Sequence, residues 1–356
     1  MRKESIVIVI LYTDLASYFL ACIEFLQDLT GGTIHIFKNG VKDEAPFTFK
    51  DNNSSVLFHD ESEFTPTELK TKIRALNPDI IYCAGWSNLK YIRTVYSIGQ
   101  REKSILGFDN KWEGNGKQKV LAFFSKIIFT RLFKQAFVPG SKQKEFATKL
   151  GFKEENIFLN AYSADYDFFR KIGSKTMPQK KKLFPRKFLF VGRYIPIKGI
   201  YDLWEAFSQI QEEEPNNWEL WSLGTGIDFG KRIIHPKIKH FGFIQPDDFQ
   251  DYLADTGVYI LPSHFEPWGV SVHEMAASGF PMILSDEIGS AEVFLDPEEN
   301  GYIFRSGNIA ELKAAMKKII SMSDTELYAM SDHSLNISSR ITPEVWAKSL
   351  LRAIAD

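Results

Sequence analysis

The sequence predicts an α/β protein with two domains, each built on a parallel sheet that helices cover on both faces. Short apolar runs, typical of buried strands, alternate with segments of helical periodicity along most of the chain. A basic, proline-containing stretch at 162–186 interrupts this alternation, which then begins again at residue 187. A chain of 356 residues is long enough for two domains that each bury a core.

The first half opens on the apolar run 6–11, which we interpret as a buried strand. Further strands are predicted at 33–37, 54–58, 79–84, 104–108, 136–138 and 156–159, with helices at 15–29, 68–76, 88–97, 117–133 and 142–150. The turn after the first strand is Tyr12-Thr13-Asp14, so the glycines of a dinucleotide-binding fingerprint are missing. This argues against a dehydrogenase.

The second half repeats the pattern after 162–186, which we interpret as an irregular linker. Strands are predicted at 187–191, 219–223, 238–241, 258–261, 282–284 and 302–304, and helices at 199–210, 246–253, 271–278, near Ala291, and at 309–320, 325–337 and 343–354. We therefore expect an N-terminal domain at 1–165, a C-terminal domain at 166–340 and a separate last helix within 341–356.

Composition and cysteine use indicate a globular cytoplasmic protein. Hydrophobic residues make up 44% and charged residues 25% of the chain, as in folded domains. Cys22 and Cys83 both lie in apolar patterns, which favours buried thiols in a reducing compartment over a disulfide framework. The apolar run near the N-terminus is too short to span a membrane.

The segment 264–281 (HFEPWGVSVHEMAASGFP) is the strongest candidate for a site. A predicted strand leads into a loop that carries Glu266, and a helix with Glu274 follows Gly269. In open α/β sheets, ligands bind beyond the carboxyl ends of the strands, where a helix start favours anions. Each glutamate could instead be a helix-dipole partner, and the pair could be a glycosidase acid and base.

A second candidate lies in 188–199 (FLFVGRYIPIKG). Arg193 follows the predicted strand directly, and Lys198 stands just before the next helix. Arginine offers a bidentate fork and lysine a compact charge, a pair that suits a diphosphate. Either residue alone is more often a plain surface charge.

The segment 117–134 combines basic and apolar residues at helical spacing. Ten Lys or Arg residues but only Glu113 and Glu145 occur within 111–153. The apolar positions are Val120, Phe123, Phe124, Ile127, Ile128 and Leu132. Such a helix can lie at the inner face of an anionic membrane, as a peripheral contact. The alternative, which we slightly prefer, is a core helix with a solvated basic flank.

Taken together, these motifs resemble the donor-binding half of family 4 glycosyltransferases. The resemblance covers 188–304 and is carried by VGRYIPIKG, LGTG at 223–226, FGFI at 241–244, VYILPS, EPWGVSVHEMAASGFP and IGSAEVFLDPEENGYIF. In the first half it is looser, through DNKWEGNGKQ at 109–118 and VPGSKQKEFATKLGF at 138–152. It implies the GT-B fold, in which two Rossmann-like domains face each other across a cleft and the last helix returns to the first domain.

The resemblance also implies an activity, which is retaining transfer of a sugar from a nucleotide-diphosphate sugar to a glycan or lipid-linked acceptor. Such an enzyme would serve polysaccharide or glycoconjugate biosynthesis and would need neither a metal nor a cofactor. The first domain would bind the acceptor and the second the donor. Nucleic acid is not an implied partner. Two alternatives stay open: a nucleotide-sugar epimerase of the same fold, or a catalytically silent nucleotide-sugar-binding protein.

Residue roles follow from the same resemblance. Arg193 and Lys198 would hold the diphosphate, Glu266 the hydroxyls of the donor sugar, and Glu274 those of the ribose. The remaining implied donor contacts are Gly192, Gly224, Phe243, Ile244, Trp268, Gly269, Val270 and Ser271, largely through the backbone.

The chain departs from the family pattern in its first half. It has no glycine at 12–17, and Tyr82-Cys83-Ala84-Gly85-Trp86 stands where many members have a histidine. Asp109 and Trp86, each just past a predicted strand, are our candidates for acceptor contact. The alternative roles are a turn cap for Asp109 and core packing for Trp86.

Overall fold

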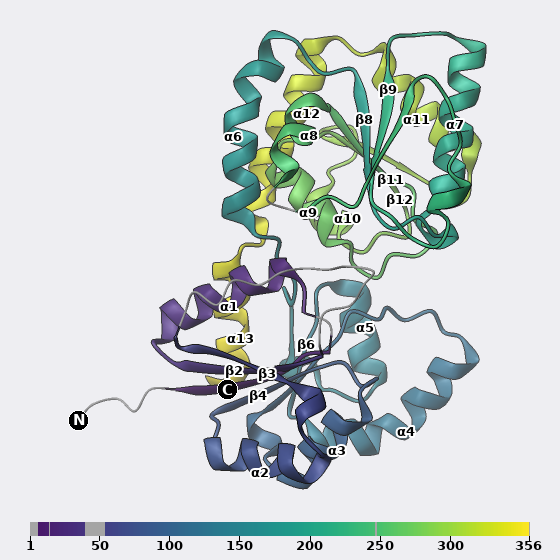
Figure 1. Ribbon diagram of the computed structural model, residues 1–356. Helices are drawn as coiled ribbons and strands as arrows, with labels where there is room; N and C mark the ends of the chain where they lie inside the picture. The colour runs from purple at the N-terminus through teal and green to yellow at the C-terminus, as the bar shows by residue number, and fades with distance from the viewer. Residues whose placement is uncertain (1–5, 14, 40–53, 246–247, 356) are drawn as a thin grey trace. The chain divides into compact units, whose positions relative to one another are not determined.

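The computed structural model describes residues 6–13, 15–39, 54–245 and 248–355. The chain divides into two compact units, of which the first comprises Met1–Asp165 with Ile341–Asp356 and the second Tyr166–Arg340 (Figure 1). Asp14, in the predicted first turn, and Pro246 and Asp247, at the start of a predicted helix, lie outside the described residues.

The described part of the first unit forms a seven-stranded sheet in the order β3-β2-β1-β4-β5-β6-β7, with parallel pairing throughout. The strands are β1 (Val7–Leu11), β2 (Thr33–Lys38), β3 (Val56–Asp60), β4 (Ile80–Ala84), β5 (Ser104–Gly107), β6 (Gln135–Phe137) and β7 (Ile157–Phe158). The helices are α1 (Ser17–Thr30), α2 (Pro66–Leu76), α3 (Leu89–Ile98), α4 (Gly116–Leu132), α5 (Ser141–Lys149) and α13 (Pro343–Ala355).

Helices cover both faces of this sheet (Figure 1). Alternate strand residues point to opposite faces, so Val9 belongs to a core with α2 to α5, whereas Ile8 belongs to a core with α1 and α13. The last helix is anchored there by Trp346, whose indole N–H donates to the Ala161 carbonyl at 2.9 Å.

The second unit has a six-stranded sheet among its described residues, in the order β10-β9-β8-β11-β12-β13 and again parallel. Its strands are β8 (Lys187–Val191), β9 (Glu219–Leu223), β10 (Ile238–Gly242), β11 (Val258–Leu261), β12 (Met282–Ser285) and β13 (Gly301–Phe304). Its helices are α6 (Tyr166–Lys182), α7 (Ile200–Glu213), α8 (Phe249–Asp255), α9 (Val270–Ala277), α10 (Ala291–Phe294), α11 (Ile309–Ser321) and α12 (Asp324–Ile337). The predicted α/β class, with a parallel sheet in each half, is confirmed.

The predicted linker at 162–186 is wrong in its centre, because residues 166–182 form helix α6 with Pro178 inside it. The helix has a buried face at near-helical spacing, made of Phe169, Ile172, Gly173, Thr176, Met177 and Lys180. It packs against α8, α9 and α12 of its own unit. A glycine, a threonine and a lysine on that face hide its amphipathic pattern in the sequence.

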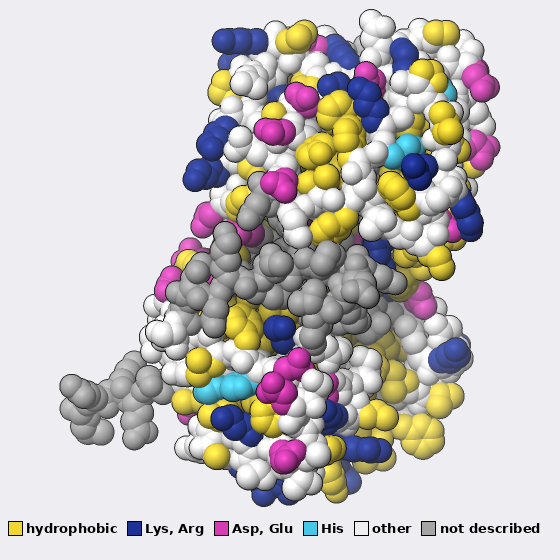
Figure 2. All heavy atoms as spheres, in the orientation of Figure 1, with side chains coloured by type: hydrophobic (Ala, Val, Ile, Leu, Met, Phe, Trp, Pro, Cys, Tyr) yellow, Lys and Arg dark blue, Asp and Glu magenta, His cyan; other side chains and the backbone are white. Residues whose placement is uncertain are grey.

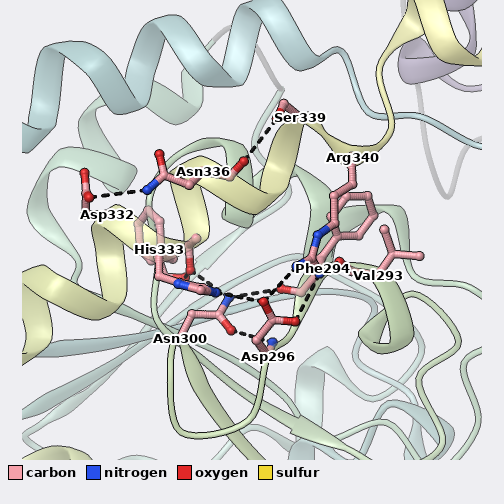
Figure 3. Close-up of polar contacts among 11 residues, drawn as sticks. Val293, Phe294, Asp296, Asn300, Asp332, His333, Asn336, Ser339 and Arg340 are labelled. Atoms are coloured by element: carbon pink, nitrogen blue, oxygen red, sulfur yellow. Dashed lines mark hydrogen bonds and ion pairs between the residues drawn. The ribbon is translucent and has the colours of Figure 1, made fainter.

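A polar network around Asp296 fastens one end of the second unit (Figure 3). Its carboxylate accepts hydrogen bonds from Arg340 at 3.0 and 2.8 Å and lies 2.8 Å from Nε2 of His333. Arg340 and then His333 hold the pKa of Asp296 below its usual range. The network ties the segment after α10 to α12 and to the end of the unit.

Candidate active site

The order in which the chain adds strands to the second sheet reverses between β8 and β11. These neighbouring central strands are paired in parallel, and their connections lead to β9 on one side and to β12 on the other. At such a switch point the loops beyond the carboxyl ends diverge and leave room for a ligand. The loop after β8 carries Arg193 and Lys198, and the loop after β11 carries Glu266.

Backbone contacts bring these two loops together. The His264 N–H donates to the Ile197 carbonyl at 2.8 Å. Gly199, with φ +67°, lies so close to the end of β11 that a Cβ atom there would stand 2.0 Å from the Pro262 carbonyl oxygen. Glycine at 199 is therefore required for this approach, which places Lys198 against the β11 loop.

Lys198 and Glu266 form a direct ion pair between Nζ and Oε2. Their side chains are 18% and 14% exposed, so solvent screens the pair less than a surface pair. The Ser263 hydroxyl also donates to Oε2 of Glu266, at 3.4 Å. The structure thus joins two of the predicted site residues that lie far apart in the sequence.

The loop from Glu266 to Gly269 is held by the segment 288–290. The Gly289 N–H donates to the Glu266 carbonyl at 3.2 Å, and the Ser290 N–H donates to the Trp268 carbonyl at 2.9 Å. The Ser290 hydroxyl donates to the Gly269 carbonyl, also at 2.9 Å. These bonds make the Glu266 loop a fixed part of the sheet edge.

Helix α9 starts directly after this loop. Gly269 adopts the left-handed conformation, with φ +91°, and among the described residues no side chain caps the helix. The Tyr259 hydroxyl donates to the Ser271 hydroxyl at 2.8 Å and so supports the first turn. Burial raises the pKa of Tyr259, and the charges of Glu266 and Glu274 add to this rise.

The other predicted donor residues lie along the same edge of the sheet. Arg193 is exposed and follows β8, while Phe243 and Ile244 are half-buried and follow β10. The N–H of Gly192 donates to the Leu223 carbonyl at 3.0 Å, and that of Gly224 to the Gly242 carbonyl at 2.6 Å. Within the segment 268–271, Trp268 is the buried residue, 2% exposed, so its ring packs inside the unit and does not face a ligand.

Three further polar residues belong to this region and were not predicted. Nε2 of His264 lies 2.7 Å from Oδ2 of Asp202 in the first turn of α7. Ser263 contacts Glu266, as described above. For two of them the available signal is position, because Ser263 and His264 lie in the loop after β11 that already carried the candidate Glu266.

The two candidates in the first unit lie at the ends of its central strands. The ring of Trp86 packs against Phe108, Phe129 and Phe146, with centroids 5.1, 5.5 and 6.0 Å apart. Asp109 is half-buried, and its charge contributes to the raised pKa of Tyr162, for which burial is the main cause.

Two features are absent from the part of the chain that the structure describes. No group of three or more His, Cys, Asp or Glu side chains is placed there to hold a metal ion. None of the helices in that part is long and apolar enough to cross a bilayer.

Comparison with known proteins finds a family match within the second unit. Residues 174–332 match the family described as glycosyl transferases group 1. The lipopolysaccharide 1,6-galactosyltransferase of Escherichia coli (strain K12) is 28% identical over 145 residues, which are 38% of this chain and 39% of that protein. The poly(glycerol-phosphate) alpha-glucosyltransferase of Bacillus subtilis (strain 168) is 23% identical over 240 residues, 65% of this chain and 34% of that protein. The chain thus spans well under half the length of these two relatives.

A solved structure extends the likeness to both units. The crystal structure of Anabaena Alr3699/HepE in complex with UDP and glucose superposes with a TM-score of 0.72 at 14% identity, covering 98% of this chain and 99% of that one. At this identity the likeness establishes the fold, which is GT-B. The chain therefore has the GT-B fold, and its residues 174–332 match the family described as glycosyl transferases group 1.

Proposed function

We propose that this chain is a cytoplasmic retaining glycosyltransferase that moves a sugar from a nucleotide-diphosphate sugar to a hydroxyl of a glycan or lipid-linked acceptor, without a metal. One observation carries the proposal. The Lys198–Glu266 ion pair lies at the switch point of the sheet, and the start of helix α9 follows the same loop. A cation for phosphate, a carboxylate for hydroxyls and a helix start thus converge at one strand edge.

In the proposed reaction, the bond between the anomeric carbon and the β-phosphate oxygen breaks, and the acceptor hydroxyl oxygen bonds to that carbon on the same face. The departing phosphate takes the hydroxyl proton. Lys198 and Arg193 neutralise the charge that develops on the leaving diphosphate, which is where fixed cations accelerate such a step most. Glu266 holds donor-sugar hydroxyls, and Glu274 holds the ribose.

The ion pair also implies an exchange of partners. Without donor, Glu266 neutralises Lys198. When a diphosphate binds Lys198, Glu266 loses its partner and can accept hydrogen bonds from sugar hydroxyls. A complete nucleotide sugar satisfies both side chains, whereas a free nucleotide diphosphate competes with Glu266 for Lys198.

The names of the relatives indicate which donors to test first. One relative is a galactosyltransferase, another a glucosyltransferase, and the superposed structure holds UDP and glucose. UDP-glucose and UDP-galactose are therefore the first donors to test, and lipopolysaccharide and polyol-phosphate acceptors fit the same names. We propose that the first unit binds the acceptor, with Asp109 nearer to it than Trp86, because the Trp86 ring packs in the core.

The decisive experiment combines binding and turnover. Nucleotide sugars are screened by thermal shift, because a ligand at a hundred times its Kd stabilises the folded protein by about 2.7 kcal/mol. The donor that stabilises most is then incubated with candidate acceptors, and NMR reports the anomeric configuration of the product. Retention supports the proposal, inversion contradicts the mechanism, and stabilisation without an acceptor-dependent product favours an epimerase or a binding protein.

Metal independence is tested in the same assay. Activity that survives EDTA is expected because Arg193 and Lys198 supply the positive charge that a metal would bring to the diphosphate. Complete inhibition that Mg²⁺ or Mn²⁺ reverses would contradict this part of the proposal.

The last part of the proposal concerns location. The basic segment 117–134 gives the first unit a surface suited to peripheral contact with the inner face of a membrane, where a lipid-linked acceptor would reside.

A further inference from the structure

Helix α4 carries two apolar stripes. The first faces the core of its unit, where Ala122, Phe129 and Leu132 are buried with Ser125. The second points outward and consists of Val120, Phe123, Phe124, Ile127 and Ile128, each between 51% and 72% exposed. We call these five residues the outer stripe. The core-helix interpretation of this segment is therefore wrong for five of its six apolar positions, and only Leu132 is buried.

The outer stripe is one continuous surface. Its positions follow the spacing i, i+3, i+4, i+7 and i+8, which places the side chains on one face of the helix. The rings of Phe123 and Phe124 meet edge to face, with centroids 5.3 Å apart. Figure 2 shows hydrophobic side chains at the surface over the position that α4 has in Figure 1. Single exposed apolar residues are ordinary, but a grouped stripe on one helix marks an interaction surface.

Positive charge surrounds this stripe. Lys117, Lys119, Lys126 and Arg131 are exposed on the same helix, which has no Asp or Glu between residues 116 and 132. Lys134, just beyond the helix, is half-buried and pairs with Glu102 at 3.5 Å, so it adds less. The complement of this surface is apolar in its centre and anionic around it, which describes an acidic lipid bilayer.

The stripe is also held in position. The Arg101 side chain donates to the Thr130 carbonyl at 2.6 Å, and the Ser125 hydroxyl donates to the Leu150 carbonyl at 3.4 Å. Asn115 caps the start of the helix by accepting from the Gln118 N–H at 2.9 Å. The helix is thus formed before it meets a partner, and binding does not require it to fold.

We propose that α4 lies flat on an anionic membrane, with the outer stripe in the boundary between headgroups and acyl chains and its four exposed cations on the phosphates. This inference rests on the proposed function and makes it more specific, since it assigns the acceptor to the class of lipid-linked substrates. It commits to a lipid surface and not to a second protein.

Sedimentation with vesicles tests the proposal on the full chain. Vesicles of equal parts phosphatidylglycerol and phosphatidylcholine should bind the protein, and vesicles of phosphatidylcholine alone should bind it far less. Each basic residue near the surface contributes about fivefold in affinity, equivalent to about 1 kcal/mol. Binding should therefore weaken strongly with salt. No binding to the anionic vesicles, or equal binding to both kinds, would overturn the proposal.

Two variants and a matched control separate the contribution of the outer stripe to vesicle binding from that of the basic residues. The double variant Phe123→Ser and Phe124→Ser should reduce vesicle affinity by about tenfold or more for each ring. The double variant Lys117→Gln and Lys119→Gln removes two of the four exposed cations and should therefore remove about half of the salt dependence. The control changes Leu89 and Tyr96 of α3 to Ser, which are 62% and 73% exposed in the same unit, and should bind vesicles as the wild type does.

Nucleotide-sugar binding, measured by calorimetry on each variant, distinguishes the possible failures. Normal donor binding without vesicle binding in the wild type would overturn the membrane inference alone. Vesicle binding without donor binding would contradict the proposed function and leave the surface assigned. Vesicle binding by the phenylalanine variant at the wild-type level would overturn the membrane inference. So would light scattering that shows a wild-type dimer which this variant loses, because the outer stripe would then be a protein interface.

Discussion

The carboxyl edges of the two sheets share a topology and differ in chemistry. The first unit begins β3-β2-β1-β4 and the second β10-β9-β8-β11, so both have a switch point between corresponding strands. In the first unit the strand ends lead into Tyr12, which is buried, and Trp86, which packs against three phenylalanines. In the second they lead into Lys198 and Glu266, which form an ion pair.

This difference shows that the fold provides a place for a site, whereas the residues at the strand ends decide whether it binds charge. Aromatic packing at the first edge is typical of a rigid support. Partly buried charged side chains, such as those at the second edge, are typical of a site that binds a charged ligand.

The largest effect is expected on turnover when a cation is removed from the second edge. Lys198→Ala should lower kcat by about 100- to 1000-fold, because in the proposed reaction it removes a positive charge aimed at the leaving diphosphate. Arg193→Ala should act in the same direction. The measurement is initial-rate kinetics with the donor identified by thermal shift.

The control for these variants is Lys239→Ala in the same sheet. Lys239 pairs with Glu219 at 3.1 Å and is half exposed, so its loss should change stability and turnover only slightly. Wild-type turnover in Lys198→Ala would show that the diphosphate is held elsewhere.

Removal of an aromatic from the first edge should instead affect stability. Trp86→Ala should lower the free energy of unfolding by about 3 kcal/mol, the lower end for a tryptophan that is only partly buried. Urea titration measures this loss, and binding of the nucleotide sugar should stay unchanged. Trp86→Phe should keep most of the packing; if it stays stable but loses turnover, Trp86 contacts the acceptor.

The two glutamates should separate nucleotide from sugar. Glu274→Gln should weaken free nucleotide diphosphate and nucleotide sugar alike, by about ten- to a hundredfold, because a hydrogen bond to a charged group contributes about 1.5–3 kcal/mol. Calorimetric titration with both ligands measures the two losses.

Glu266→Gln is the matched control. It should weaken the nucleotide sugar but not the free nucleotide diphosphate, which should bind equally well or slightly tighter once Lys198 has lost its partner. Similar losses of free nucleotide in the two variants would contradict the separate roles.

The buried histidine of the second unit, His273, should make the free energy of unfolding depend on pH. His273 in α9 is buried, stacks on Phe294 and donates from Nε2 to the Ser338 carbonyl at 3.0 Å. Burial lowers its pKa to about 3. Because the unfolded chain takes up this proton near pH 6.5 and the folded chain does not, stability is complete above pH 6.5 and falls as the pH approaches 3.

Between pH 7 and pH 5 this histidine should cost about 2 kcal/mol of unfolding free energy, at about 1.36 kcal/mol per pH unit below 6.5. Urea titrations at the two pH values measure the change. His273→Gln keeps a donor for Ser338 and should lose this part of the slope. Burial also lowers the pKa values of His35 and His59 in the first unit. These two histidines should contribute equally to the pH slope of the wild type and of the variant. An unchanged slope in the variant would exclude His273 as its cause.

Much of the fold could be predicted from the sequence because it depends on local patterns. Apolar runs and helical spacing predicted the strands of both sheets within about two residues, as such patterns allow. The position of Lys198, Glu266 and Glu274 at strand ends and at a helix start followed from the same patterns. Parallel sheets bring successive strand ends to one edge, so these residues could be assigned to one region.

The rest depended on contacts between distant residues. Helix α6 was missed because its buried face includes Lys180, whose ammonium lies 3.6 Å from the centre of the Phe280 ring. No local pattern reveals that a lysine is covered by a residue a hundred positions away. The outer stripe of α4 has the same apolar composition as a core face, and only the packed unit shows that Phe129 turns inward while Phe123 stays outside. The pairing of Lys198 with Glu266 likewise requires the close approach at Gly199, which exists only once β8 and β11 lie side by side.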